Sequence, residues 1–121
     1  MTKYGTPTHG GRFDLGVIDC ELRASEAYAR EGHTARTLSR EDDLRVVLIA
    51  MKAGARMNEH RAQQTSAIQV ISGHVRLLLA NETTDVRSGQ LLVLERGVQH
   101  DVEAVLDSAL LLTLGWPPGH P

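Results

Sequence analysis

The stretch that decides the fold runs from residue 54 to residue 73 and reads GARMNEHRAQQTSAIQVISG. In it, His60 follows Gly54 after five residues, and Gly73 closes the stretch. A second frame, residues 89–100, reads GQLLVLERGVQH and ends in His100. Glycine permits the sharp turns that begin and end such frames, and residues at even offsets of a strand share one face. The two frames therefore predict two imidazoles that converge from different strands.

Short apolar segments separated by glycine turns surround these frames. The run Leu44–Met51 carries a single charge, Arg45, which is typical of a strand covered on both faces. Gly73 and His74 predict a tight hairpin turn, in which we expect His74 to be solvent-exposed. The pattern predicts an antiparallel sandwich or barrel and does not choose between them. The other predicted strands cover residues 33–38, 67–72, 75–80, 83–87, 91–94, 98–105 and 109–115.

The residues before the strands predict one helix and a loosely held N-terminus. Residues 19–31 carry a modest apolar face, with Asp19 as a plausible N-cap and Gly32 as the stop. We expect a flexible arm over residues 1–16, one barrel domain over residues 17–116 and a tail over residues 117–121.

Composition narrows the class of protein. The chain has 121 residues, of which 41% are hydrophobic, and this suits one compact domain. The formal charge is −2 and no basic run stands out, so nucleic-acid binding has little support. No apolar run is long enough for a membrane span, and no signal peptide is evident, so we expect a cytoplasmic protein. Cys20 is the only cysteine, which excludes an internal disulfide.

The two glycine-histidine frames resemble the two signature motifs of the cupin superfamily. The resemblance covers roughly residues 44–115, and the short interval between Gly73 and Gly89 is similar to that of small single-domain microbial cupins. It implies an all-β fold, the cupin double-stranded β-helix or jelly-roll-like barrel, here with one short N-terminal helix. It also implies a homodimer, as does the apolar run Leu44–Met51, which needs cover from the helix or from a second chain.

The resemblance implies a metal held by three histidines and one glutamate. Here Ala62 stands at the second histidine position and Ser66 at the glutamate position, which leaves His60 and His100 as candidate ligands. Two neutral imidazoles without a carboxylate form a poor site for iron or manganese. We therefore expect a weak or absent site for a divalent transition metal, with Zn, Fe, Ni and Mn as candidates.

Three functions remain open on the sequence alone. The first is binding of an unidentified small molecule in the barrel interior. The alternatives are a metal-dependent cupin oxygenase or isomerase that uses His60 and His100, and a non-catalytic interaction or sensor module. Whether the protein is an enzyme stays open, and no catalytic residue is predicted. The predicted ligand pocket consists of His60, Ala62, Gln64, Ser66, Ile68, His100 and Val102.

Overall fold

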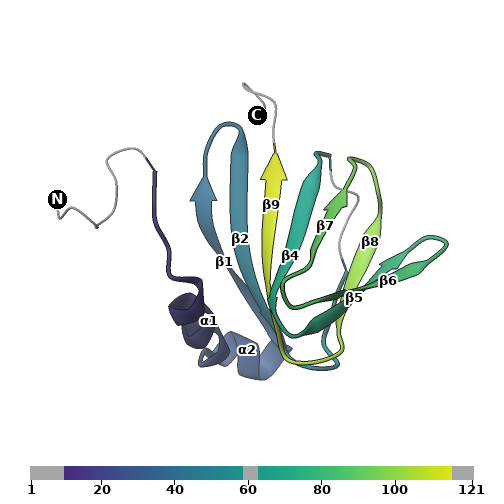
Figure 1. The fold of residues 1–121 in the computed structure, drawn as a ribbon. Coiled ribbons are helices and arrows are strands. Elements are labelled where there is room, and N and C mark those ends of the chain that lie inside the picture. Colours follow the sequence, from purple (N-terminus) through teal and green to yellow (C-terminus); the bar gives the residue numbers. More distant parts are fainter. Residues whose placement is uncertain (1–9, 59–62, 116–121) are drawn as a thin grey trace.

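The computed structural model describes residues 10–58 and 63–115, which form two antiparallel sheets and two short helices (Figure 1). One sheet has five strands in the order β1-β2-β9-β4-β7, and the other has four in the order β3-β8-β5-β6. The predicted antiparallel all-β architecture is confirmed. The helices are α1 (Leu15–Arg23) and α2 (Glu26–Glu31), and the strands are β1 (His33–Arg40), β2 (Leu44–Met51), β3 (Arg56–Asn58), β4 (Ser66–Ser72), β5 (His74–Leu79), β6 (Thr83–Arg87), β7 (Leu91–Leu94), β8 (His100–Ala104) and β9 (Ser108–Gly115).

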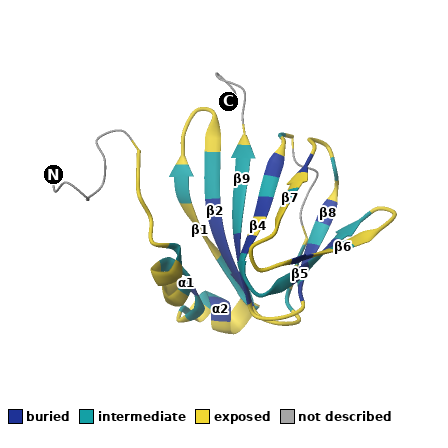
Figure 2. Cartoon of the chain, in the orientation of Figure 1, coloured by how far each residue is buried: buried dark blue, intermediate teal, exposed yellow. Residues whose placement is uncertain are grey.

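Strand β2 is apolar on both faces, and both faces are covered, as the sequence predicts. One face joins the main core between the two sheets, and the opposite face packs under the helices (Figure 2). The strand lies between β1 and β9, so its cover comes from its own chain. The homodimer stays a prediction that no longer rests on this strand. The residues of β2 in the main core are Val47, Ile49 and Met51, and the cluster under the helices consists of Leu22, Tyr28, Leu48 and Ala50.

The prediction of one helix over residues 19–31 is wrong, because the segment forms two helices. Asp14, rather than Asp19, caps α1 and accepts a hydrogen bond from the Val17 amide at 3.1 Å. Ser25 ends this first helical segment and starts the second: its hydroxyl donates to the Leu22 carbonyl at 2.7 Å and accepts from the Tyr28 amide at 3.2 Å. Gly32 ends α2 in the left-handed region, as predicted.

Neither of the helices in the described residues has the length and apolar character that crossing a membrane requires. Among the strands, β2, β6 and β7 begin and end where the sequence predicts. Strand β3 has no counterpart among the predicted strands, because only Met57 of its three residues is apolar. Most of the predicted arm, the tail over residues 117–121, and His60 and Ala62 lie outside the described residues.

The end of the barrel that contains the turns around Gly73, His74 and Ser108 is called the closed end here. The Ser108 hydroxyl is fully buried, accepts from the His74 amide at 3.0 Å and donates to the Leu106 carbonyl at 2.7 Å. The His74 side chain is 15% exposed, so the prediction that it is solvent-exposed is wrong. His74 is the first residue of β5, and its ring lies beside Asp85 of the neighbouring strand β6, with 3.5 Å between His74 Nε2 and Asp85 Oδ1.

Candidate functional site

The opposite end of the barrel, which contains Ser66, Leu94, His100 and Gly115, is called the open end. His100 is the first residue of β8 and is only 6% exposed. It faces inward because β8 alternates between buried and half-buried residues, starting from a buried one. Its Nδ1 lies 3.2 Å from the Val98 carbonyl oxygen. Because a carbonyl oxygen only accepts, this contact assigns the proton of the neutral ring to Nδ1 and leaves Nε2 as an acceptor.

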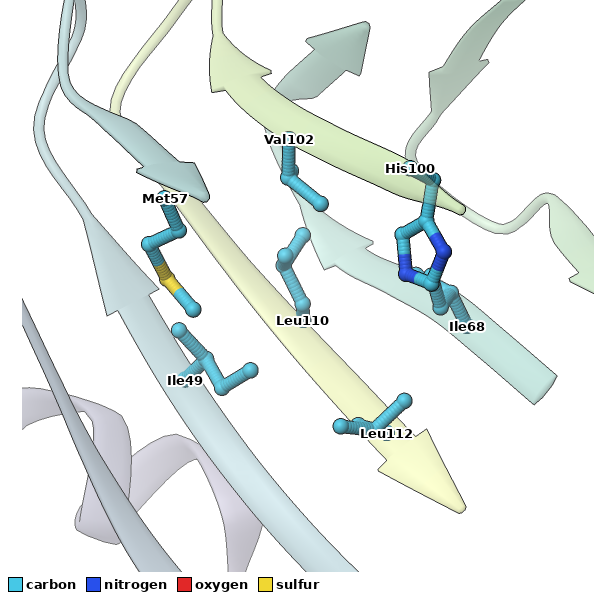
Figure 3. A pocket seen from close by; sticks show the side chains of 7 residues that line it. All are labelled: Ile49, Met57, Ile68, His100, Val102, Leu110 and Leu112. Carbon is cyan, nitrogen blue, oxygen red and sulfur yellow. The ribbon is translucent and has the colours of Figure 1, made fainter. Parts of the chain in front are cut away.

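The His100 ring borders a small cavity between the two sheets, with apolar walls on its other sides (Figure 3). Five strands supply the walls, and pairing between β3 and β8 sets Met57 opposite Val102. The cavity measures about 20 Å³, which is room for roughly one water molecule. An imidazole is thus the one polar side chain among its described lining residues, which are Ile49, Met57, Ile68, His100, Val102, Leu110 and Leu112.

Ser66 lies at the same end of the barrel, on the face of β4 that also carries Ile68 and Val70. The residue is 3% exposed, and its Oγ has no hydrogen-bond partner among the described residues. Buried hydroxyls in native proteins are nearly always paired, because leaving one unpaired costs about 1–3 kcal/mol. The Ser66 hydroxyl is one of three buried side-chain atoms, with Arg45 Nε and His74 Nε2, that have no hydrogen-bond partner among the described residues.

A larger cleft, called the outer cleft, lies at the same end of the barrel and is bordered by residues of β3, β5 and β8. Its volume is about 320 Å³. Arg56 of β3 and Asp101 of β8 form an ion pair in it, with 2.6 Å between Nη2 and Oδ2. His100 belongs to the lining of both the cleft and the inner cavity, so it is the residue that the two spaces share. The residues that line the cleft are Arg56, Leu78, Leu79, Ala80, Gln99, His100 and Asp101.

The structure brings some of the predicted pocket residues together and leaves others apart. Ile68, His100 and Val102 line the inner cavity, and Ser66 shares the inward face of β4. Gln64 precedes β4, is half-buried and lines neither cavity. His60 and Ala62 lie outside the described residues. Sequence reasoning missed four residues of the cavity lining, Ile49, Met57, Leu110 and Leu112. The apolar runs of β2 and β9 were a signal for three of them, Ile49, Leu110 and Leu112.

The donors in the described residues do not fit the four-ligand metal site that the cupin motifs imply. Within residues 10–58 and 63–115, no three His, Cys, Asp or Glu side chains gather so that they could hold a metal ion. At the glutamate position of the motif, Ser66 offers a neutral, unpaired hydroxyl in place of a carboxylate. His100 is the one imidazole that lines the cavity in this part of the chain.

Comparison with solved structures shows a recurrent fold. A conserved protein of unknown function from Streptococcus pyogenes superposes with a TM-score of 0.73 at 23% identity, covering 98% of each chain. KdgF from Halomonas sp. gives a TM-score of 0.63 at 21% identity, over 69% of this chain and 80% of that one. A cupin superfamily protein from Desulfitobacterium hafniense gives 0.73 at 12% identity, over 97% of this chain and 100% of that one.

Salicylate 1,2-dioxygenase from Pseudoaminobacter salicylatoxidans, in its adducts with gentisate, gives a TM-score of 0.76 at 18% identity. The match covers 94% of this chain but only 35% of the dioxygenase. At these identities the structures share a fold and nothing finer. No curated protein sequence matches the chain.

The sequence of residues 45–115 matches the family described as the AraC-like ligand binding domain. The match spans most of the strands, from the second residue of β2 to the end of β9, and includes every residue that lines the inner cavity. The chain therefore belongs to the AraC-like ligand-binding domain family, and its barrel is a small cupin domain.

Proposed function

We propose that the protein binds a small organic molecule at the open end of the barrel, beside His100 and Ser66, without a resident metal. The observation that carries the proposal is a buried imidazole among apolar walls, with a buried hydroxyl, unpaired among the described residues, two positions before Ile68 on the same face of β4. Pockets of this kind, mostly apolar with a few placed polar groups, are typical of small-molecule sites. The description of the matching family, a ligand-binding domain, supports the same function.

The chemistry of the lining favours binding over catalysis. Neutral His100 presents Nε2 as an acceptor, and protonation turns the same atom into a donor. The Ser66 hydroxyl can donate and accept. Proton transfer in catalysis generally needs an acid and a base that face the same substrate, and His100 is the one titratable residue among those described in the cavity lining. An amphipathic molecule, with one polar group on a short apolar body, suits this set.

A second candidate is a non-catalytic interaction module. The observation that favours it is the small volume of the inner cavity, about 20 Å³, because Leu, Ile, Val and Met side chains fill the rest of the space. A module of this kind would use the barrel only as a scaffold. The two functions differ in whether any small molecule perturbs the cavity walls.

Methyl NMR spectroscopy of protein labelled at Ile, Leu, Val and Met separates these functions. We expect short aliphatic alcohols and carboxylates to shift the Met57, Ile68 and Leu110 methyl signals in a saturable manner, with Kd of about 1 mM or tighter. His100→Leu should abolish the shifts. His74→Gln, which changes a histidine at the closed end, should preserve them.

Elemental analysis of protein purified without added metal and without a nickel column completes the test. We expect far less than one transition-metal ion per chain. A stoichiometric metal would overturn the proposal and revive the oxygenase or isomerase hypothesis. Cavity methyl signals that stay fixed with every probe, in metal-free protein, would favour the interaction module.

A further inference from the structure

We propose that the body of the ligand occupies the outer cleft, that a methyl-sized tip passes His100 into the barrel, and that the ligand is an amphipathic monocarboxylate bound by Arg56. This inference rests on the proposed function and names the chemical class of its ligand. It follows from the sizes of the two cavities, from the residue that they share and from the charges in the cleft.

The two cavities differ in volume by more than an order of magnitude. The inner cavity, at about 20 Å³, accepts one methyl-sized group, whereas the cleft offers about 320 Å³. Small-molecule sites in proteins usually measure about 300–1,000 Å³. The cleft is therefore the space with room for most of a ligand, and the inner cavity has room only for its end.

His100 joins the two spaces. It lies in the lining of both, at the start of β8 and opposite Leu79 of β5. Figure 3 shows its ring beside Ile68, at the opposite side of the cavity from Met57. A ligand that contacts both spaces must pass this ring, which makes His100 the residue that sets the width and polarity of the passage.

The cleft is lined by both apolar and charged residues. Leu78, Leu79 and Ala80 supply the apolar contacts. Arg56 is half-exposed and donates from Nη2 to Asp101. A guanidinium has five N–H donors, so Arg56 can bind a second carboxylate while it keeps the first.

The cost of burying charge fixes the direction in which the ligand enters. A carboxylate inside the inner cavity would lose its water and face six apolar side chains, a transfer that costs several kcal/mol when the charge is not fully compensated. In the cleft the same carboxylate keeps part of its water and gains the Arg56 guanidinium. The apolar end therefore enters the barrel, and the carboxylate stays outside.

Two substitutions that break the same ion pair test this arrangement. The probes are hexanoate and 1-hexanol, titrated into methyl-labelled protein, with Leu78 and Leu79 signals reporting on the cleft and Ile68 signals on the cavity. We expect hexanoate to bind about fivefold more weakly to Arg56→Gln. Asp101→Asn removes the competing carboxylate and should strengthen hexanoate binding or leave it unchanged. Neither substitution should alter 1-hexanol binding.

The outcomes separate this inference from the proposed function. Hexanoate could shift the Ile68 signals but not the Leu78 or Leu79 signals, with equal affinity for wild type and Arg56→Gln. This result would contradict binding of the ligand in the cleft and would leave the proposed function standing. Equal weakening by Arg56→Gln and Asp101→Asn would show that the ion pair acts only on structure, and this would also overturn it. If neither probe shifts any of these methyl signals, the proposed function itself fails.

Discussion

The two ends of the barrel each bury a serine, and the two serines behave in opposite ways. Ser108 at the closed end accepts from the His74 amide and donates to the Leu106 carbonyl. Ser66 at the open end is almost as deeply buried, yet its hydroxyl has no hydrogen-bond partner among the described residues. At the closed end, these hydrogen bonds of Ser108 connect the turn at His74 with the turn at Leu106. At the open end the Ser66 hydroxyl is unpaired among the described residues, and the His100 imidazole borders an apolar cavity.

The difference in hydrogen bonding between the two serines has opposite consequences for the stability of the fold. A hydrogen bond inside the chain stabilises the native state, and an unpaired buried group lowers its stability until a ligand pairs with it. The paired serine at the closed end therefore contributes to folding, while the serine at the open end retains an unpaired hydroxyl. Substitutions at matched positions of the two ends should show the contrast directly.

The largest effect is expected for Gly73→Ala at the closed end. Gly73 has a φ of 98°, and a Cβ built there would overlap the Ser108 hydroxyl and the Asp107 carbonyl. We expect a loss of about 3 kcal/mol or more in the free energy of unfolding, measured by urea denaturation. Gly89 has a similar φ of 83° with nothing near its Cβ position. Gly89→Ala should therefore cost only about 1–2 kcal/mol, and equal losses would show that the overlap is relieved.

The two serines provide the next largest contrast. Ser108→Ala leaves the buried His74 amide without its acceptor and should cost about 2 kcal/mol. Ser66→Ala removes an unpaired hydroxyl, so it should be neutral or should stabilise by up to about 1 kcal/mol. Urea denaturation of both variants without ligand measures the difference. A clear loss in Ser66→Ala would mean that this hydroxyl is paired in solution and that the contrast between the ends is wrong.

The smallest effect concerns Asp85, which faces the His74 ring. A hydrogen bond from Arg76, at 3.0 Å, is the largest cause that lowers the Asp85 pKa below its ordinary value of 3.8, and His74 adds to it. The unfolded chain therefore binds a proton at Asp85 more readily than the folded chain does. The ionised Asp85 carboxylate makes its full contribution to the free energy of unfolding above the ordinary pKa, and this contribution is lost as pH falls through the lower folded pKa.

Asp85→Asn should therefore be less stable than wild type at neutral pH, and the difference should shrink in acid. Urea denaturation of both proteins between about pH 6 and about pH 2 checks this. A difference that stays constant over the whole range would show that Asp85 does not titrate with folding. Since the carboxylate is partly exposed, we expect a smaller effect than at Gly73 or Ser108.

Much of the fold could be predicted from local sequence, because strand spacing and glycine turns are local signals. Strand β2 has a continuous apolar run that identifies it without any tertiary information. Strand β3 could not be found in this way, since three residues with one apolar side chain carry no period, and the strand exists through its pairing with β8. The two helices escaped prediction as separate elements because one serine inside an otherwise helical pattern does not by itself break it, and the role of Ser25 as N-cap shows only in the structure.

The candidate site was harder to predict than the fold. Alternation along β4 and β8 places Ile68, His100 and Val102 on inward faces, which the sequence alone reveals. It does not reveal that Leu110 and Leu112 of β9 face them, because that depends on which strands are neighbours. The cleft around Arg56 depends on pairing between β3 and β8, whose residues are more than 40 positions apart in the sequence. Whether the predicted pocket residues bind a ligand stays a prediction.

The place of β9 in the five-stranded sheet has a consequence for the order in which the chain can fold. It is the last strand of the described residues, yet it lies in the middle of the sheet, hydrogen-bonded to β2 on one side and β4 on the other. During synthesis, β2 and β4 emerge early and have no shared neighbour until β9 leaves the ribosome. The β1–β2 hairpin can form in the meantime, but the sheet cannot be completed before the final strand inserts, and β2 presents an apolar edge throughout that interval.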